Sequence, residues 1–195
     1  HLMKIEKILV ANRGEIAIRI FRACVELNIK TVGVYTYEDR YSQHRYKADE
    51  SYQIGGRDEP LKPYLDMDEI IGLAVEKGVD AIHPGYGFLS ENPQFARKCK
   101  ENGIIFIGPD ADIMEKLGDK ISAKKVAKEC DVPIIESNER PLDTSDIAGE
   151  EAERIGYPLM LKATAGGGGR GIRKVTSADE LTDAYQRTRD EAERA

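Results

Sequence analysis

Short apolar runs alternate with amphipathic segments along the first half of the chain. Four of these runs are continuous, as is typical of strands buried on both faces, and a fifth is more polar, as in an edge strand. They cover Ile8–Ala11, Thr31–Tyr35, Asp80–His83 and Ile104–Ile107, with Asp49–Ile54 as the edge strand. Because helical patterns separate the runs, the sequence predicts an α/β fold with a doubly wound parallel sheet and right-handed crossovers.

The first of these helical patterns lies between residues 15 and 27. Its apolar residues recur at the spacing of one helix face, and the predicted buried set is Ile16, Ile20, Cys24 and Leu27. Another face of the same helix gathers charged residues, namely Arg19, Arg22 and Glu26. Such a charged stripe is either a solvated surface or a contact between subunits, and the spacing leaves both interpretations open.

Capping signals predict where the later helices begin. Asp66-x-x-Glu69 and Ser177-x-x-Glu180 have the spacing of a capping box, and Asn92-Pro93 combines a capping residue with a first-turn proline. After a break at Gly118, Asp119 is predicted to cap a helix that reaches about residue 130. The predicted buried residues of that helix are Ile121, Val126 and Ala127. One more helix is predicted over 145–155.

A glycine tract separates two apolar runs in the last part of the chain. The run Pro158–Ala163 contains Lys162, the glycines are Gly166–Gly169, and a second strand-like run covers Gly171–Val175. Glycine lets backbone N–H groups approach an anion, and a lysine nearby adds positive charge, so polyphosphate is the natural ligand. The tract differs from a Walker A loop, because Arg170 follows the glycines and no helix start comes after it. We predict a strand–glycine loop–strand hairpin that closes over a nucleotide; the alternative is a surface hairpin without a ligand.

Three further positions are candidates for chemistry. The segment His83–Asn92 follows a strand, at the end where open α/β sheets bind ligands, and its glycines present Tyr86 on a tight turn. Glu38-Asp39 also follows a strand, where an acidic residue would hold a ribose in a dinucleotide fold, although the first turn lacks G-x-G-x-x-G. Lys120 lies at a predicted helix start, where the helix dipole disfavours a cation unless an anionic ligand is present.

Composition narrows the functional classes. The 195 residues carry a net charge of −6, which argues against nucleic acid and anionic membranes as partners, and no apolar run has the length of a membrane span. The three histidines lack metal-ligand spacing, so no protein metal site is predicted. We interpret the cysteines as core thiols of a cytoplasmic protein; they are Cys24, Cys99 and Cys130.

Five segments together resemble the biotin carboxylase family. In the family's order they are Val10–Ala17, His83–Asn92, Phe106–Pro109, Gly118–Lys120 and the stretch from Lys162 to Gly171. The resemblance implies an ATP-grasp protein. Residues 1–3 look like a remnant of cloning, 4–115 would be the preATP-grasp (biotin carboxylase N-terminal) subdomain, and 116–134 a linking helix and crossover. Residues 135–195 would begin a lid subdomain that is cut short.

The resemblance also implies an activity. In this family ATP, with Mg²⁺, and bicarbonate form carboxyphosphate, which carboxylates a biotin tethered to another domain, and the carboxyl then passes to an acceptor. His44–Tyr52 and Pro158–Ala163 look most like the members that carboxylate pyruvate to oxaloacetate. The implied ATP contacts are Lys120, Lys162, Gly166, Gly167, Gly168, Gly169 and Arg170. Tyr86 would lie near the biotin, with His83 and Glu91 shaping its turn. Arg19, Arg22 and Glu26 match a helix through which family members form oligomers.

The same resemblance places the magnesium-binding glutamates and the bicarbonate site in later segments of the family. No catalytic residue is therefore expected in these 195 residues, and the chain alone is expected to be inactive. The alternatives are a carboxylase that acts on acetyl-CoA or propionyl-CoA, an ATP-grasp carboxylate–amine ligase, a non-catalytic nucleotide-binding or dimerisation module, and an NAD-binding oxidoreductase.

Overall fold

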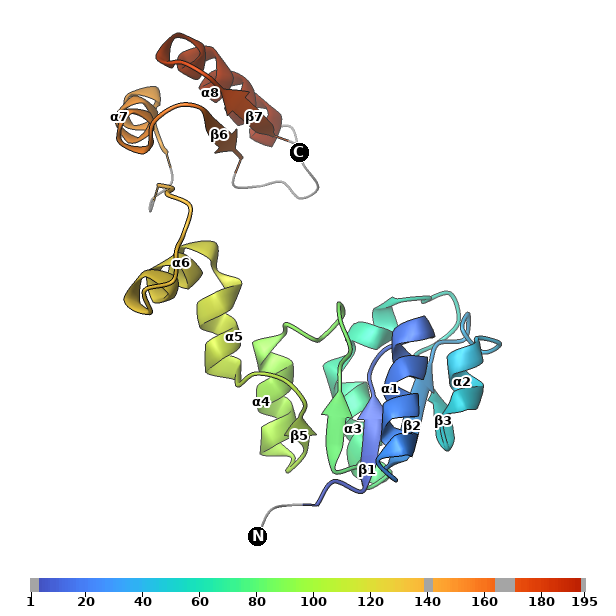
Figure 1. The fold of residues 1–195 in the computed structure, drawn as a ribbon. Coiled ribbons are helices and arrows are strands. Elements are labelled where there is room, and N and C mark those ends of the chain that lie inside the picture. Colours follow the sequence, from blue (N-terminus) through green and yellow to red (C-terminus); the bar gives the residue numbers. More distant parts are fainter. Residues whose placement is uncertain (1–3, 139–141, 164–170, 194–195) are drawn as a thin grey trace. The chain divides into compact units, whose positions relative to one another are not determined.

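The computed structural model describes residues 4–138, 142–163 and 171–193, which divide into two compact units between Val126 and Ala127 (Figure 1). The elements up to that division are β1 (Lys7–Val10), α1 (Gly14–Glu26), β2 (Lys30–Tyr35), α2 (Gln43–Lys47), β3 (Glu50–Gln53), the 3₁₀ helix η1 (Lys62–Leu65), α3 (Met67–Glu76), β4 (Ala81–His83), α4 (Pro93–Glu101), β5 (Ile105–Phe106), α5 (Ala111–Gly118) and α6 (Lys120–Glu129), whose last turn crosses it. The second unit contains α7 (Ser145–Ile155), β6 (Leu159–Lys162), β7 (Ile172–Val175) and α8 (Ala178–Glu193).

The first unit is built on a five-stranded sheet in which every pair is parallel. The strand order is β3-β2-β1-β4-β5, so β1 is central and β3 lies at an edge, which confirms the predicted parallel sheet and its edge strand. The register pairs Ile8 with Thr31 on one side and with Ala81 on the other. The chain leaves β1 toward β2 and β3, and then returns past β1 to form β4 and β5.

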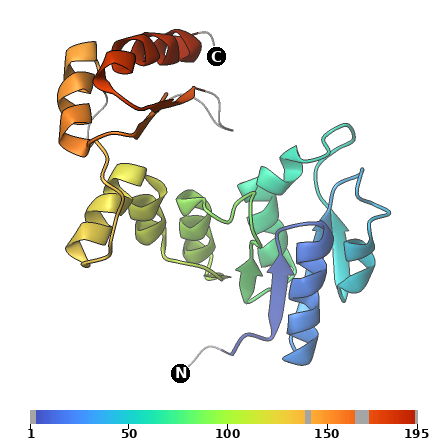
Figure 2. The same cartoon turned by 45° about the horizontal axis from the view of Figure 1, so that its top comes forward.

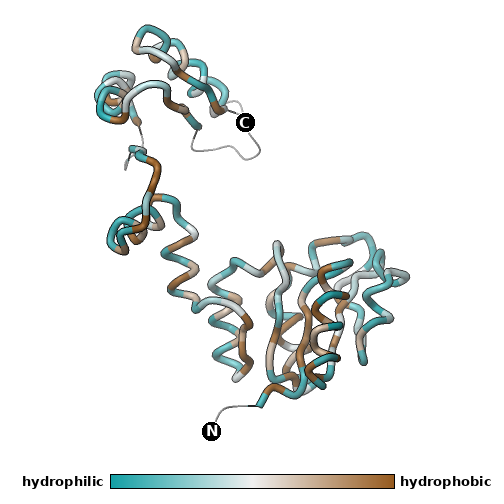
Figure 3. Tube along the Cα trace, viewed as in Figure 1, coloured by the Kyte–Doolittle hydropathy of each residue, from teal (hydrophilic) through white to brown (hydrophobic). Residues whose placement is uncertain are grey.

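Helices cover both faces of this sheet. The side chains of β1 alternate: Ile8 and Val10 pack in one cluster with α1, and Leu9 packs in the other with α3 and α4. Figures 1 and 2 show α1 and α3 on opposite sides of the strands, and Figure 3 shows hydrophobic residues along the central strands. A strand covered on both faces needs apolar side chains at successive positions, which explains its continuous run.

Some residues predicted to be buried are exposed. Leu27 is 70% exposed because it is the C-cap residue of α1 and has left the buried face, whereas Phe21 is buried in its place. In α6, Ile121 is 48% exposed and no described residue is buried, because this helix contributes to neither core of the first unit; Val126 and Ala127 are only partly covered. Cys130, which follows α6, is exposed as well, unlike Cys24 and Cys99.

The capping predictions are confirmed in part. Asn92 accepts a hydrogen bond from the backbone N–H of Phe95, and Asp119 accepts one from Ser122. Asp66 caps α3 through the N–H of Glu69, but the Glu69 carboxylate accepts from Gly55 instead of completing the box. In the same way, the carboxylate of Glu180 in α8 accepts from both the N–H and the hydroxyl of Thr176, the residue before the predicted cap.

The second unit is a two-stranded antiparallel hairpin packed against two helices. The register pairs Leu159 with Val175 and Lys162 with Ile172, which confirms that the two predicted strands pair with each other. Leu161 and Val175 are buried with residues of α7 and α8. Across the parts of the chain that the structure describes, no helix combines the length and the hydrophobicity of a membrane span.

Candidate functional site

The carboxyl ends of β1 and β4 are the natural place for a ligand in the first unit. These neighbouring strands are parallel, but the chain continues from them toward opposite edges of the sheet: from β1 to β2, and from β4 to β5. Open α/β sheets bind ligands at such a switch point, because the loops on either side diverge there. The two loops are residues 11–13, after β1, and residues 84–92, after β4, and the second contains Tyr86.

Tyr86 is presented by a turn with unusual backbone angles. Gly85 and Gly87 have φ values of 66° and 68°, and Phe88 has 42°, a region that glycine enters without strain and other residues rarely adopt. The Tyr86 side chain is 66% exposed. The predicted aromatic presentation is therefore present in the fold.

His83 fixes the start of this turn. Its Nδ1 accepts a hydrogen bond of 3.0 Å from the N–H of Gly85, and burial lowers the pKa of the imidazole, which keeps the ring neutral so that Nδ1 can accept. Glu91 lies at the other end, exposed, one residue before the α4 cap Asn92. The structure thus places His83 in contact with the turn and Glu91 at its far end.

Asn12 joins the two loops, a role that the sequence patterns did not reveal. Its Nδ2 donates hydrogen bonds of 2.8 Å to the carbonyls of both Pro84 and Tyr86, and its Oδ1 accepts from the N–H of Arg13. The residue is 3% exposed. Its place in the segment Val10–Ala17, directly after a buried strand, is the sequence feature that could have drawn attention to it.

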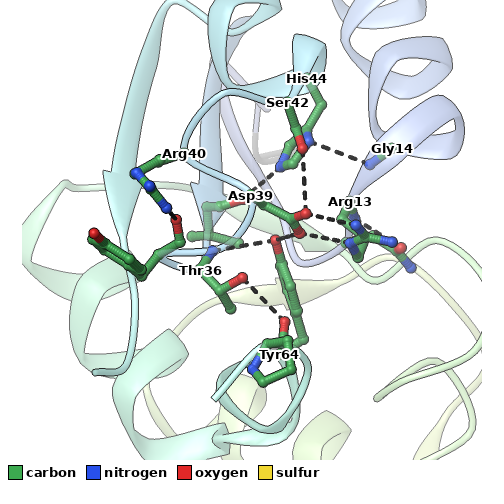
Figure 4. A network of polar contacts seen from close by, with 12 residues as sticks. Arg13, Gly14, Thr36, Asp39, Arg40, Ser42, His44 and Tyr64 are labelled. Carbon is green, nitrogen blue, oxygen red and sulfur yellow. Dashed lines mark hydrogen bonds and ion pairs between the residues drawn. The ribbon is translucent and has the colours of Figure 1, made fainter. Parts of the chain in front are cut away.

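The next residue, Arg13, forms an ion pair with the buried carboxylate of Asp39 (Figure 4). The Arg13 guanidinium donates to both carboxylate oxygens of Asp39, at 2.6 and 2.5 Å, and the Tyr64 hydroxyl donates to the same carboxylate at 2.6 Å. These bonds lower the pKa of Asp39 to about 2, with Arg13 as the largest cause, while burial and the Asp39 contact raise the pKa of Tyr64. The network ties α1 to the loop after β2.

The same network removes the basis of the dinucleotide alternative. Its candidate ribose ligands were Glu38 and Asp39, but Asp39 is 5% exposed and holds Arg13 and Tyr64, and Glu38 accepts a bond from the N–H of Asp58. The Asp39 carboxylate is therefore occupied by contacts within the fold, and Glu38 is an exposed loop residue.

His44 supports the first turn of α1 from the other side. Its Nε2 lies 3.0 Å from the Val34 carbonyl, and Nδ1 accepts from the N–H of Gly14 at 3.3 Å, so the ring is the tautomer protonated on Nε2. The ring is fully buried, and this burial lowers its pKa. The start of α1 is thus held by neutral hydrogen bonds as well as by the Arg13–Asp39 pair.

The predicted phosphate ligands belong to both units, Lys120 to the first and Lys162 to the second. Lys162 is exposed near the end of β6, on the face of the hairpin opposite buried Leu161, and the N–H of Ala163 donates to the Gly171 carbonyl across the hairpin. Gly166–Gly169 and Arg170, between these positions, lie outside the described residues. Lys120 is the exposed first residue of α6.

The open face of the hairpin combines cationic and apolar groups. Pairing of Lys162 with Ile172, and of Met160 with Lys174, puts these four side chains on one face, and Met160 and Ile172 are 55% and 39% exposed. A face with lysines beside apolar side chains can hold a phosphate and cover an aromatic base. Among the described residues, no group of three or more histidine, cysteine or acidic side chains could hold a metal ion.

The charged stripe on α1 lies on the surface of the single chain, which agrees with both of its interpretations, a solvated face and a subunit contact. Arg19, Arg22 and Glu26 all face solvent in this chain, and Arg19 lies 3.8 Å from Glu15 one turn earlier. Exposed pairs at this spacing contribute only about 0.5 kcal/mol, so the stripe has little part in holding the helix.

Comparison with known proteins identifies the class that this fold and site define. Residues 4–114 match the family model for the biotin carboxylase N-terminal domain, and residues 119–195 match that for the ATP-binding domain of the carbamoyl-phosphate synthase L chain. The chain belongs to the biotin carboxylase family.

Individual relatives are similar over the whole chain. Pyruvate carboxylase of Staphylococcus aureus is 53% identical over 100% of this chain, which corresponds to 17% of that protein. The biotin carboxylase domain dimer of Hydrogenobacter thermophilus 2-oxoglutarate carboxylase, in complex with MgADP, ADP and bicarbonate, is 48% identical over 99% of this chain and 42% of its own, with a TM-score of 0.84. A variant of Rhizobium etli pyruvate carboxylase with acetyl coenzyme A is 48% identical over 99% of this chain and 17% of its own, with a TM-score of 0.80.

Proposed function

We propose that this chain is the N-terminal part of the biotin carboxylase component of a pyruvate carboxylase. Such an enzyme uses MgATP and bicarbonate to carboxylate a biotin carried on another domain, and transfers the carboxyl to pyruvate. The observation that carries the proposal is the 53% identity to a pyruvate carboxylase across the whole chain. The alternative acceptors, acetyl-CoA and propionyl-CoA, belong to enzymes of the same family and are separated from pyruvate by assay.

In this proposal the hairpin of the second unit binds the phosphates of ATP. Lys162 supplies a positive charge on the open face, and the backbone N–H groups of Gly166–Gly169, with Arg170, cover the phosphates together with Lys120. The support is the position of Lys162, which is exposed and pairs with Ile172 at the end of the hairpin nearest the glycine tract. The residues fit a polyphosphate, since cationic side chains and glycine N–H groups are donors for phosphate oxygens. Mg²⁺ would accompany the nucleotide, and its protein ligands would come from the later segments in which the family carries its magnesium-binding glutamates.

The turn after β4 is proposed to contact the biotin. Tyr86 offers an exposed aromatic ring at the switch point of the sheet, with His83 fixing the start of the turn. The carrier domain would bring the biotin to this edge. This role requires no proton transfer by Tyr86 or His83, because Tyr86 contacts the biotin and His83 holds the turn in place.

Oligomerisation and location complete the proposal. The exposed stripe of Arg19, Arg22 and Glu26 is proposed as part of a contact between two copies, and the relative of known structure from H. thermophilus is a dimer of this domain. A cytoplasmic location is proposed because Cys24 and Cys99 are buried free thiols, which is typical of proteins from reducing compartments.

The proposal is tested with the full-length protein encoded by the reading frame that contains this chain. We expect ATP cleavage that requires bicarbonate and rises when free biotin is added. ATP cleavage that ignores bicarbonate would contradict the proposal. The 195-residue chain by itself, which spans 42% of the biotin carboxylase domain of known structure, is expected to show no bicarbonate-dependent cleavage in the same assay.

A further inference from the structure

One buried amide, that of Asn12, binds two backbone carbonyls of the turn around Tyr86. Both hydrogens of the Asn12 amide nitrogen are used, one for the Pro84 carbonyl and one for the Tyr86 carbonyl. These two carbonyls point inward to Asn12, while the Tyr86 side chain points to solvent with 66% of its surface exposed. The orientation of the ring therefore depends on where the two carbonyls are fixed.

The close packing of Asn12 against Gly85 requires a glycine at position 85. A Cβ atom built on Gly85 would lie 2.6 Å from the Asn12 amide nitrogen and 3.1 Å from its amide carbon. Any side chain at Gly85 would collide with the amide, and its φ of 66° adds strain for other residues. Since Asn12 is 3% exposed, water cannot replace its bonds without a rearrangement of the turn.

The far end of the turn has a second support. The Phe88 ring stacks on Tyr64, with 5.1 Å between ring centroids, and the Tyr64 hydroxyl is held by Asp39. Asp39 in turn holds Arg13, whose backbone N–H donates to the Asn12 side-chain oxygen. A continuous set of contacts thus runs from Phe88 through the Arg13–Asp39 ion pair to Asn12.

We propose that Asn12 is a positioning residue for biotin carboxylation: it orients Tyr86 toward the biotin without touching biotin or the reacting atoms. This inference rests on the proposed function, in which Tyr86 contacts biotin. The inference predicts different effects on two steps of the reaction, whereas a general loss of folding would impair both. The use of free biotin depends on the turn, whereas ATP cleavage with bicarbonate in the absence of biotin does not.

The test measures these two steps in the full-length protein prepared without biotin on its carrier domain, with free biotin as the probe. Asn12→Asp keeps the volume but replaces the donor with an acceptor, and Asn12→Ala removes the side chain. We expect either change to raise KM for free biotin about tenfold, while biotin-free, bicarbonate-dependent ATP cleavage stays within about twofold of the unsubstituted protein. Asn12→Ser, which retains a small donor, covers the case in which the alanine variant fails to fold, and it should show the same split with a smaller rise.

Asn102→Ala is the matched control. Its side-chain amide also donates a 2.8 Å bond to a backbone carbonyl, that of Lys98, but at the exposed end of α4. It should leave KM for biotin unchanged. The inference is overturned if Asn12 variants keep a normal KM for biotin, or if both steps fall in parallel with a lower melting temperature. Absence of biotin stimulation in the unsubstituted protein overturns the proposed function and the inference with it, so the two failures are distinguishable.

Discussion

The Arg13–Asp39 ion pair predicts how the first unit responds to one substitution. Asp39→Asn keeps the shape of the side chain but removes the charge that holds Arg13 and accepts from Tyr64. Asp39 is 5% exposed, so no water replaces the lost interactions at the carboxyl. The side chain of Arg13 is 42% exposed and can be partly rehydrated, which limits the cost of leaving it without a partner.

The magnitude follows from the pKa of Asp39. A carboxyl whose pKa falls from 3.8 to about 2 on folding contributes about 2.4 kcal/mol to the free energy of unfolding at neutral pH. Because the folded-state pKa is the lower one, this contribution is complete well above pH 3.8 and is lost as the pH falls toward 2; about half of it remains at pH 3. We expect Asp39→Asn to destabilise the first unit by about 2 to 3 kcal/mol at pH 7, with a smaller difference in acid.

The stability of this unit alone is measured by unfolding the protein in urea. Hydrogen exchange in peptides that contain β1 and β2 reports the unfolding. The matched control is Asp112→Asn, since Asp112 also faces a guanidinium, that of Arg97 at 3.2 Å, but is 84% exposed. The control should change stability by no more than about 0.5 kcal/mol. If Asp39→Asn costs no more than Asp112→Asn, or if its effect does not shrink at low pH, the assigned role of the Arg13–Asp39 pair is wrong.

Three further outcomes are expected. Lys162→Met should raise KM for ATP in the full-length protein about tenfold, whereas Lys174→Met, on the same face but farther from the glycine tract, should change it little; steady-state kinetics decides. Arg22→Glu should shift sedimentation of the full-length protein toward smaller species, and an unchanged profile would exclude the stripe from the subunit contact. In the folded chain, a thiol reagent at pH 8 should titrate only the exposed Cys130 rapidly, because burial raises the pKa of the other two thiols.

The fold was predictable from sequence where one local pattern determines it. The strand at Lys7–Val10 was expected at Ile8–Ala11, because burial on both faces requires a continuous apolar run. Exposure of Leu27 and Ile121 was not predictable, since periodicity shows which side of a helix is apolar but not whether another element covers it. The short helix α2 and the 3₁₀ helix η1 carry no such pattern and were missed.

The contacts that build the site depend on residues far apart in the chain. Asn12 bonds to Pro84 across 72 positions, and Tyr64 reaches Asp39 across 25. No local spacing encodes such pairs, so the contacts of Asn12, Arg13 and Tyr64 escaped prediction, and Asp39 was considered only as one half of the weaker dinucleotide alternative. The turn around Tyr86 was predictable, because its glycines mark the backbone angles that it needs.

The measurement that tests the central claim most directly uses labelled bicarbonate. The full-length protein is supplied with MgATP and ¹⁴C-bicarbonate and, in separate reactions, with pyruvate, acetyl-CoA, propionyl-CoA or no acceptor. Our account predicts acid-stable label only with pyruvate, and its loss when avidin is added. Label on an acyl-CoA would show that the acceptor is that acyl-CoA and not pyruvate, and the biotin carboxylase assignment would stand. No label with any acceptor, together with indifference to avidin, would contradict the account.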